Sequence, residues 1–167
     1  MRHASRQDYR RAAKAYREAI ALRPDEPEAY YNLGTALANS AHIVEAAQRY
    51  LEAKERLSVG SVKWAVATAR AFSMLIQEAC AEVAKPEWWN DEGLKALSAR
   101  VVRAAPDELP AIRMRAMVLK GSRAWEAGPR SAAELREAAV HFQRAAALCP
   151  APIGPVSYTH LTLPTKA

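Results

Sequence analysis

The chain has 167 residues, of which 50% are apolar, and it carries a net charge of +6 at pH 7. This length suits one compact domain or a short repeat array, and it excludes a two-domain enzyme with a large substrate domain. Abundant Ala with few Gly and only 2 Phe favours closely packed helices and disfavours an all-β or Rossmann-type fold.

The cysteine content and the apolar segments bear on the cellular compartment. Cys80 and Cys149 are too few for a disulfide scaffold, and the N-terminal sequence has no apolar stretch typical of a signal peptide. The most apolar segment, residues 64–84, is interrupted by Arg70 and by two Glu residues, so it does not resemble a membrane span. We expect a protein of a reducing intracellular compartment, the cytoplasm, without membrane contact.

Apolar periodicity and capping residues predict an all-α chain of seven helices. Pro27 and Pro110, each preceded by acidic residues, mark two helix starts. Asn90 and Ser131 are expected N-caps, and Glu134 completes a capping box with Ser131. The predicted helices cover residues 5–22, 27–40, 43–57, 61–84, 90–104, 108–125 and 131–148.

One residue spacing recurs along these helices. A small residue, an aromatic residue four positions later and a small residue after seven positions share one helix face, and the residue at offset twelve ends the helix. The copies are Ala12, Tyr16, Ala19 and Pro24; Ala46, Tyr50, Ala53 and Ser58; and Ala138, Phe142, Ala145 and Pro150, with a weaker copy at Leu94, Ser98, Val101 and Pro106.

A second stripe, Tyr30, Leu33, Gly34 and Leu37, precedes the second copy. Together the two stripes resemble the tetratricopeptide repeat (TPR), a 34-residue helix pair with aromatic, Leu-Gly, Ala and Pro residues at fixed positions. Residues 25–58 match this pattern well, with departures at Ala41, where Gly is usual, and at Ser58, where Pro is usual.

The resemblance implies an α-solenoid, a right-handed superhelix of antiparallel helix pairs. The repeat ends divide residues 1–150 into a half repeat at 1–24, a repeat at 25–58 and enlarged repeats at 59–106 and 107–150. We place the extra residues in the long helix within 61–84 with the loop after it, and in the segment before the last helix.

In TPR arrays the first helix of each pair lines a concave groove, and this implies candidate partner-binding residues. Alignment through Gly34 and Ala116 gives a groove set at Tyr31, Asn32, Thr35, Asn39, Arg113 and Lys120, which Arg70 extends. A partly basic groove favours acidic or C-terminal peptide ligands. The alternative is that these cations belong to ordinary solvated helix faces.

The adjacent indoles of Trp88 and Trp89 form another candidate contact. Two neighbouring rings in a loop cannot both enter one helix-packing seam, so one, taken as Trp88, is expected to stay accessible as a binding anchor. The alternative is that both rings cover the enlarged third repeat.

No established catalytic, nucleotide-binding or metal-binding motif occurs in the sequence. The histidines lie far apart, so a metal site from His42 and His141 would have to span about three repeats. We therefore expect no catalytic residues, no metal and no cofactor.

The C-terminal residues Val156 to Thr165 resemble the conceptual translation of a sequencing-library transposase adaptor. All ten residues agree with that translation, and the Ala/Arg/Glu-rich helical sequence stops at Pro150. We therefore interpret residues 151–167 as a disordered, non-native tail and expect this chain to be a fragment of a longer protein.

The function predicted from these features is that of a protein-protein interaction scaffold, which binds a peptide or partner subunit, with acidic ligands favoured. The alternative is a helical-repeat RNA-binding or processing factor, which would need a continuous basic surface. Acidic residues such as Glu18, Glu45 and Glu52 interrupt such a surface.

Overall fold

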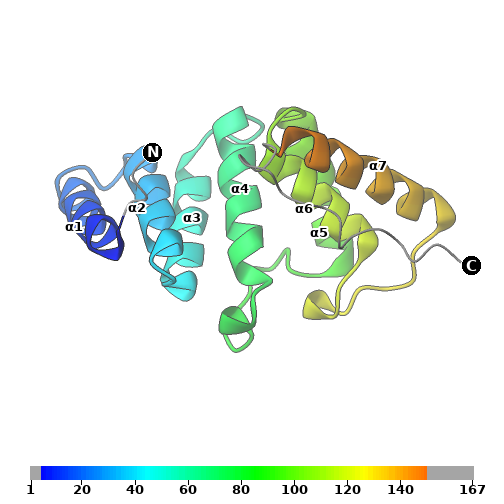
Figure 1. Ribbon diagram of the computed structural model, residues 1–167, viewed down its shortest axis with the longest axis horizontal. Coiled ribbons are helices and arrows are strands. Elements are labelled where there is room, and N and C mark those ends of the chain that lie inside the picture. The colour runs from blue at the N-terminus through cyan, green and yellow to red at the C-terminus, as the bar shows by residue number, and fades with distance from the viewer. Residues whose placement is uncertain (1–4, 150–167) are drawn as a thin grey trace, which may run out of the picture.

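A computed structural model describes residues 5–149 as a row of helices (Figure 1). This part of the chain contains seven α-helices and two short 3-10 helices, and no strand occurs within it. The α-helices are α1 (Arg6–Leu22), α2 (Pro27–Asn39), α3 (Ile43–Arg56), α4 (Val62–Leu75), α5 (Asp91–Ala104), α6 (Leu109–Lys120) and α7 (Ala132–Leu148). The 3-10 helices are η1 (Glu78–Cys80) and η2 (Arg123–Trp125).

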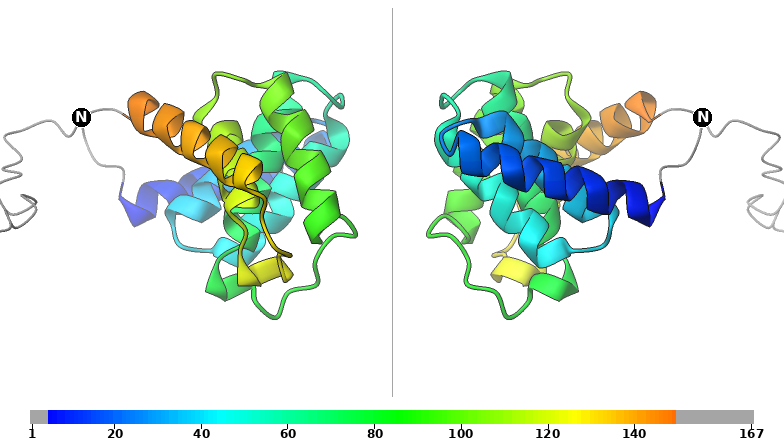
Figure 2. Two further views of the ribbon diagram at one scale, coloured as in Figure 1. Left: turned by 90° about the vertical axis from the view of Figure 1, so that its right-hand side faces the viewer. Right: turned by 90° about the vertical axis from the view of Figure 1, so that its left-hand side faces the viewer.

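Each helix packs against the next one in the chain, and α4 also contacts α6. Helix α1 covers one end of the row and α7 the other (Figures 1 and 2). This packing of consecutive helices confirms the predicted all-α, TPR-like solenoid.

Capping residues fix several helix starts where the sequence predicts them. The Ser131 side chain accepts from the Glu134 amide, and the Glu134 carboxylate accepts from the Ser131 amide at 2.8 Å. The Asn90 side chain accepts from the Gly93 amide at 2.9 Å. These bonds satisfy amide donors that the first helical turn leaves without a partner.

The recurrent small and aromatic residues form the core in the middle of the row. Ala46, Tyr50 and Ala53 of α3 are buried, and Tyr50 lies against Gly34 of α2. A Cβ on Gly34 would lie 3.0 Å from the Tyr50 ring, so glycine permits this close helix approach. At the end of the row, the equivalent aromatic residue Phe142 is 38% exposed because no described helix covers it.

The predicted helix over 61–84 is wrong in its second half. Helix α4 ends at Leu75, the backbone of Gln77 is extended, and η1 follows. This turn brings Cys80 against α3, where it is buried with Ala47 and Leu75. No Gly or Pro marks the break, so it arises from the burial of Cys80 and not from a local signal.

The predicted helix over 108–125 is also too long. Helix α6 ends at Lys120 because Gly121 has φ +85°, a conformation that glycine adopts readily. The chain then turns into η2 and buries Trp125 against Phe72, with the ring centroids 5.8 Å apart.

Candidate functional site

A cleft of about 330 Å³ lies between α2 and α4, and the start of α6 closes one side of it. Helix α2 contributes one wall of the cleft and α4 the other. The first helices of two successive pairs therefore face each other across it. The lining residues are Pro27, Glu28, Tyr31, Asn32, Leu57, Val62, Lys63, Val66 and Glu108.

Most of this lining is apolar, and its charges are largely compensated within the cleft. Lys63 donates to the Glu28 carboxylate across the cleft. This hydrogen bond lowers the pKa of Glu28 and raises the pKa of Lys63, so both groups stay charged near neutral pH. Glu108, at the N-cap of α6, is the third charged residue of the lining.

Tyr31 is held in place by contacts beneath the cleft. Its ring meets the Tyr50 ring edge to face, with centroids 5.3 Å apart. Thr35 lies 3.0 Å from the Tyr50 hydroxyl and donates to the Tyr31 carbonyl, so the Thr35 hydroxyl is used within the fold. Burial raises the pKa of Tyr50, which keeps that hydroxyl protonated.

The structure therefore brings two predicted groove residues, Tyr31 and Asn32, into one cleft. Asn39, Arg70 and Lys120 are exposed, but they do not line this cleft. The Arg113 guanidinium donates to the Cys149 sulfur at 3.1 Å, beside the end of α7. The sequence alignment did not identify Leu57, which follows the second helix of its pair, or Glu108, which caps the start of α6.

Trp88 lies at a different place, in a cavity between α3, α4 and α5. Both indoles of the adjacent pair are partly buried and pack against the core. Trp89 joins an aromatic cluster with Phe72 and Trp125, and its ring N–H donates to the Ala124 carbonyl at 3.0 Å. Both rings thus cover the core of the enlarged repeat, and Trp88 also lines a cavity.

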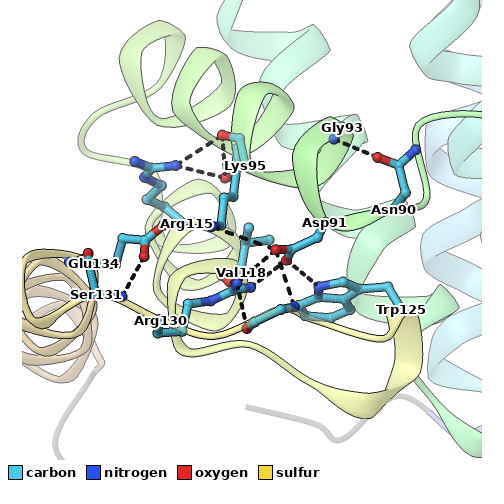
Figure 3. Close-up of polar contacts among 12 residues, drawn as sticks. Asn90, Asp91, Gly93, Lys95, Arg115, Val118, Trp125, Arg130, Ser131 and Glu134 are labelled. Atoms are coloured by element: carbon cyan, nitrogen blue, oxygen red, sulfur yellow. Dashed lines mark hydrogen bonds and ion pairs between the residues drawn. The ribbon is translucent and has the colours of Figure 1, made fainter.

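Asp91 organises a polar network between α5 and the segment before α7 (Figure 3). Its two carboxylate oxygens accept from Arg130 at 2.9 and 2.6 Å, and also from the Trp125 ring N–H and the Gly128 amide. The hydrogen bonds from Arg130 hold the pKa of Asp91 well below its usual range. Because protein donors surround this carboxylate, the network ties the extra segment to α5.

A second ion pair reinforces this attachment. Lys95 lies 2.7 Å from the Glu134 carboxylate, and this contact, with the capping bonds to Ser131, lowers the pKa of Glu134 to about 2. The sequence analysis identified Glu134 only as part of the capping box with Ser131. No local pattern links Glu134 to Lys95 or Asp91 to Arg130, because the members of each pair are far apart in the sequence.

Residues 2–40 match the family model of the TPR repeat. These residues are thus similar to a TPR repeat, and the match covers less than half of the chain. In the described part, the match spans α1 and α2, the first two helices of the row. No curated protein matches the sequence.

Two further features of residues 5–149 bear on other classes of site. None of the helices within residues 5–149 is both long and apolar enough to cross a membrane. In the same part of the chain, no group of three or more His, Cys, Asp or Glu side chains is placed to hold a metal ion.

Proposed function

We propose that this protein is a TPR-like interaction scaffold that holds a peptide segment of a partner protein in the cleft between α2 and α4. The observation that carries the proposal is the lining of this cleft. Most of it comes from α2 and α4, the first helices of two successive pairs, and it includes Tyr31 and Asn32 of α2. The TPR match of residues 2–40 supports a role in protein interaction.

The chemistry of the cleft suits an apolar side chain with backbone amides beside it. Leu57, Val62 and Val66 provide apolar surface, and Tyr31 is a rigid aromatic contact. Asn32 is exposed and carries both a donor and an acceptor, so it can bond a peptide backbone. The volume lies near the lower end of small-ligand sites, which begin at about 300 Å³, and thus fits part of a peptide.

The sequence-based preference for an acidic partner rests on cations that do not line the cleft. Arg70, Arg113 and Lys120 lie outside the cleft, whereas Glu28 and Lys63 compensate each other inside it. We propose that apolar contact in the cleft selects the peptide and that these cations act on flanking acidic residues. The scaffold performs no chemistry in this proposal, and its free cysteines suit a reducing compartment such as the cytoplasm.

The test is a selection of random peptides on the whole chain, followed by affinity measurement with one enriched peptide. Asn32→Ala should weaken binding about fivefold, because about 1 kcal/mol of hydrogen bonding is lost. Val66→Glu should abolish binding, because it places a charge on the apolar wall.

Asn39→Ala is the matched control, since Asn39 is also an exposed Asn of α2 but does not line the cleft. It should bind the peptide like the unmodified chain. Failure to enrich any peptide, or equal affinities for Asn32→Ala, Val66→Glu and Asn39→Ala, would contradict the proposal.

A further inference from the structure

A second cavity, of about 250 Å³, lies between α3, α4, α5 and the loop before α5. It is separate from the peptide cleft, because α4 contributes Trp64 here and Val62, Lys63 and Val66 there. Its lining combines two indoles, Trp64 and Trp88, with two cations, Lys54 and Arg100, and is completed by Val59, Gly93, Ala96 and Leu97.

Each cation lies over an indole face. The Lys54 ammonium is 5.8 Å from the Trp88 ring centroid, and the Arg100 guanidinium carbon is 5.4 Å from the Trp64 ring centroid. Within residues 5–149, no carboxylate oxygen lies within 4.0 Å of either cation. The cavity thus presents two positive charges that lack an ion-pair partner in the described chain.

Lys54 is held in an environment that disfavours its own charge. Its side chain is partly buried, and burial lowers the pKa of Lys54. The neighbouring charge of Arg100 acts in the same direction, whereas Glu55 acts in the opposite one. A bound anion would relieve the repulsion between the two cations.

The walls of the cavity are fixed before any ligand arrives. A Cβ on Gly93 would lie 2.6 Å from the Trp88 carbonyl oxygen, so only glycine lets the loop approach α5 this closely. The Asn90 amide donates to the same carbonyl at 2.9 Å. Trp64 is 2% exposed, and Trp88 packs against Trp89 with centroids 5.9 Å apart.

We propose that this cavity binds a phosphate monoester that carries a small apolar or aromatic group. A phosphate monoester has a charge of about −1.5 to −2 at neutral pH, which the two cations match. The planar Arg100 guanidinium can hold two phosphate oxygens, and Lys54 supplies a point charge. The indoles and Leu97 provide the apolar surface for the organic group.

The test is titration of the whole chain with phenyl phosphate in a phosphate-free buffer, followed by calorimetry and by tryptophan fluorescence. Saturable binding is expected, and Lys54→Gln and Arg100→Gln should each weaken it about tenfold, because each removes a charged hydrogen-bond donor. Lys54→Arg, which keeps the positive charge, should bind phenyl phosphate more tightly than Lys54→Gln does. Inorganic phosphate and phenol should each bind more weakly than phenyl phosphate.

Arg103→Gln is the matched control, because it removes an exposed cation from the same helix outside the cavity. It should leave the affinity unchanged, and circular dichroism should show full helicity for every variant. The proposal is overturned if phenyl phosphate does not bind, if Arg103→Gln weakens it as much as Arg100→Gln, or if inorganic phosphate binds equally well.

Discussion

Asp91 is the residue through which the extra segment before α7 is attached to the array. Its carboxylate accepts from the Arg130 side chain, the Trp125 ring and the Gly128 backbone. The Arg130 side chain is only 6% exposed, so it depends on this carboxylate for compensation of its charge. The removal of the carboxylate charge would leave Arg130 poorly paired inside the fold.

We predict that Asp91→Asn lowers the free energy of unfolding at pH 7 by about 2 kcal/mol, as measured by urea denaturation. A fully buried pair would lose about 3–5 kcal/mol, but the Asp91 side chain is still 23% exposed. Because the pKa of Asp91 is lowered in the fold, its contribution is present above the unfolded value of about 3.9. The difference between the two chains should shrink as the pH falls from about 4 toward the folded pKa.

The control for this measurement is Glu92→Gln, which changes an exposed carboxylate in the same helical turn. It should cost about 0.5 kcal/mol or less, because only a helix-dipole interaction is lost. Equal losses for the two substitutions would show that the Asp91 network contributes nothing specific.

Residue identity alone predicted part of the site and missed the rest for a physical reason. Tyr31 and Asn32 followed from their register relative to Gly34, because helical periodicity fixes which side chains share a face. The pairing of Lys63 with Glu28 did not follow, since it joins two helices whose relative placement depends on packing. The partner-binding roles of Thr35, Arg70, Arg113 and Lys120 remain predictions, and so does that of Asn39, although the proposed peptide site expects no contact from Asn39.

At the scale of elements, helix starts were predicted better than helix ends. Helix starts such as that of α7 carry side-chain caps, here Ser131. These caps act within one turn, so a short stretch of sequence is enough to predict them. The end of α4 depends on the return of Cys80 to the core, which is a long-range effect. Gly121 was a usable local signal, because a glycine with positive φ commonly follows a helix end.

The loop before α5 is the element whose position is most tightly determined by one residue. We predict that Gly93→Ala lowers the free energy of unfolding by about 1 kcal/mol and shifts tryptophan emission to longer wavelength. The added Cβ would meet the Trp88 carbonyl oxygen, a backbone atom that can move only with the loop. Overpacking costs about 1–3 kcal/mol, and this exceeds the gain of about 1 kcal/mol from replacing Gly with Ala in a helix.

Glu92→Ala tests whether this effect belongs to the position or to the helix. Glu92 precedes Gly93 in the same turn and is exposed, so its replacement by Ala should leave tryptophan emission unchanged. If Gly93→Ala is as stable as the original chain, the loop is not held against α5 in the manner described.

At the scale of the whole molecule, the solenoid arrangement separates two kinds of surface. The cleft between α2 and α4 is mainly apolar with compensated charges, whereas the cavity beside α5 carries two cations without ion-pair partners in the described chain. The repeat pattern predicted the row of helices because each helix buries its stripe on the next. It could not predict the cavity, whose lining comes from α3, α4 and α5 together with the α3–α4 turn and the loop before α5.

The charge distribution of the described row favours the scaffold over the RNA-binding alternative. Arg10, Arg11 and Lys14 of α1 are exposed, but Arg17 of the same helix is paired with Glu45 of α3 at 2.9 Å. Glu45 therefore interrupts the basic surface next to α1, which disfavours a continuous line of phosphate contacts along the row.

We predict that the chain binds a polyuridine oligonucleotide no more tightly than the non-specific range of about 10⁻⁴ to 10⁻⁶ M at physiological salt. The combined change of Arg10, Arg11 and Lys14 to Gln should leave the affinity for the selected peptide unaltered, because α1 does not line the cleft. Fluorescence anisotropy over a range of salt concentrations measures both. Tight RNA binding that this combined change removes, with the salt dependence falling by about 0.7 per lost contact, would instead establish the RNA-binding alternative.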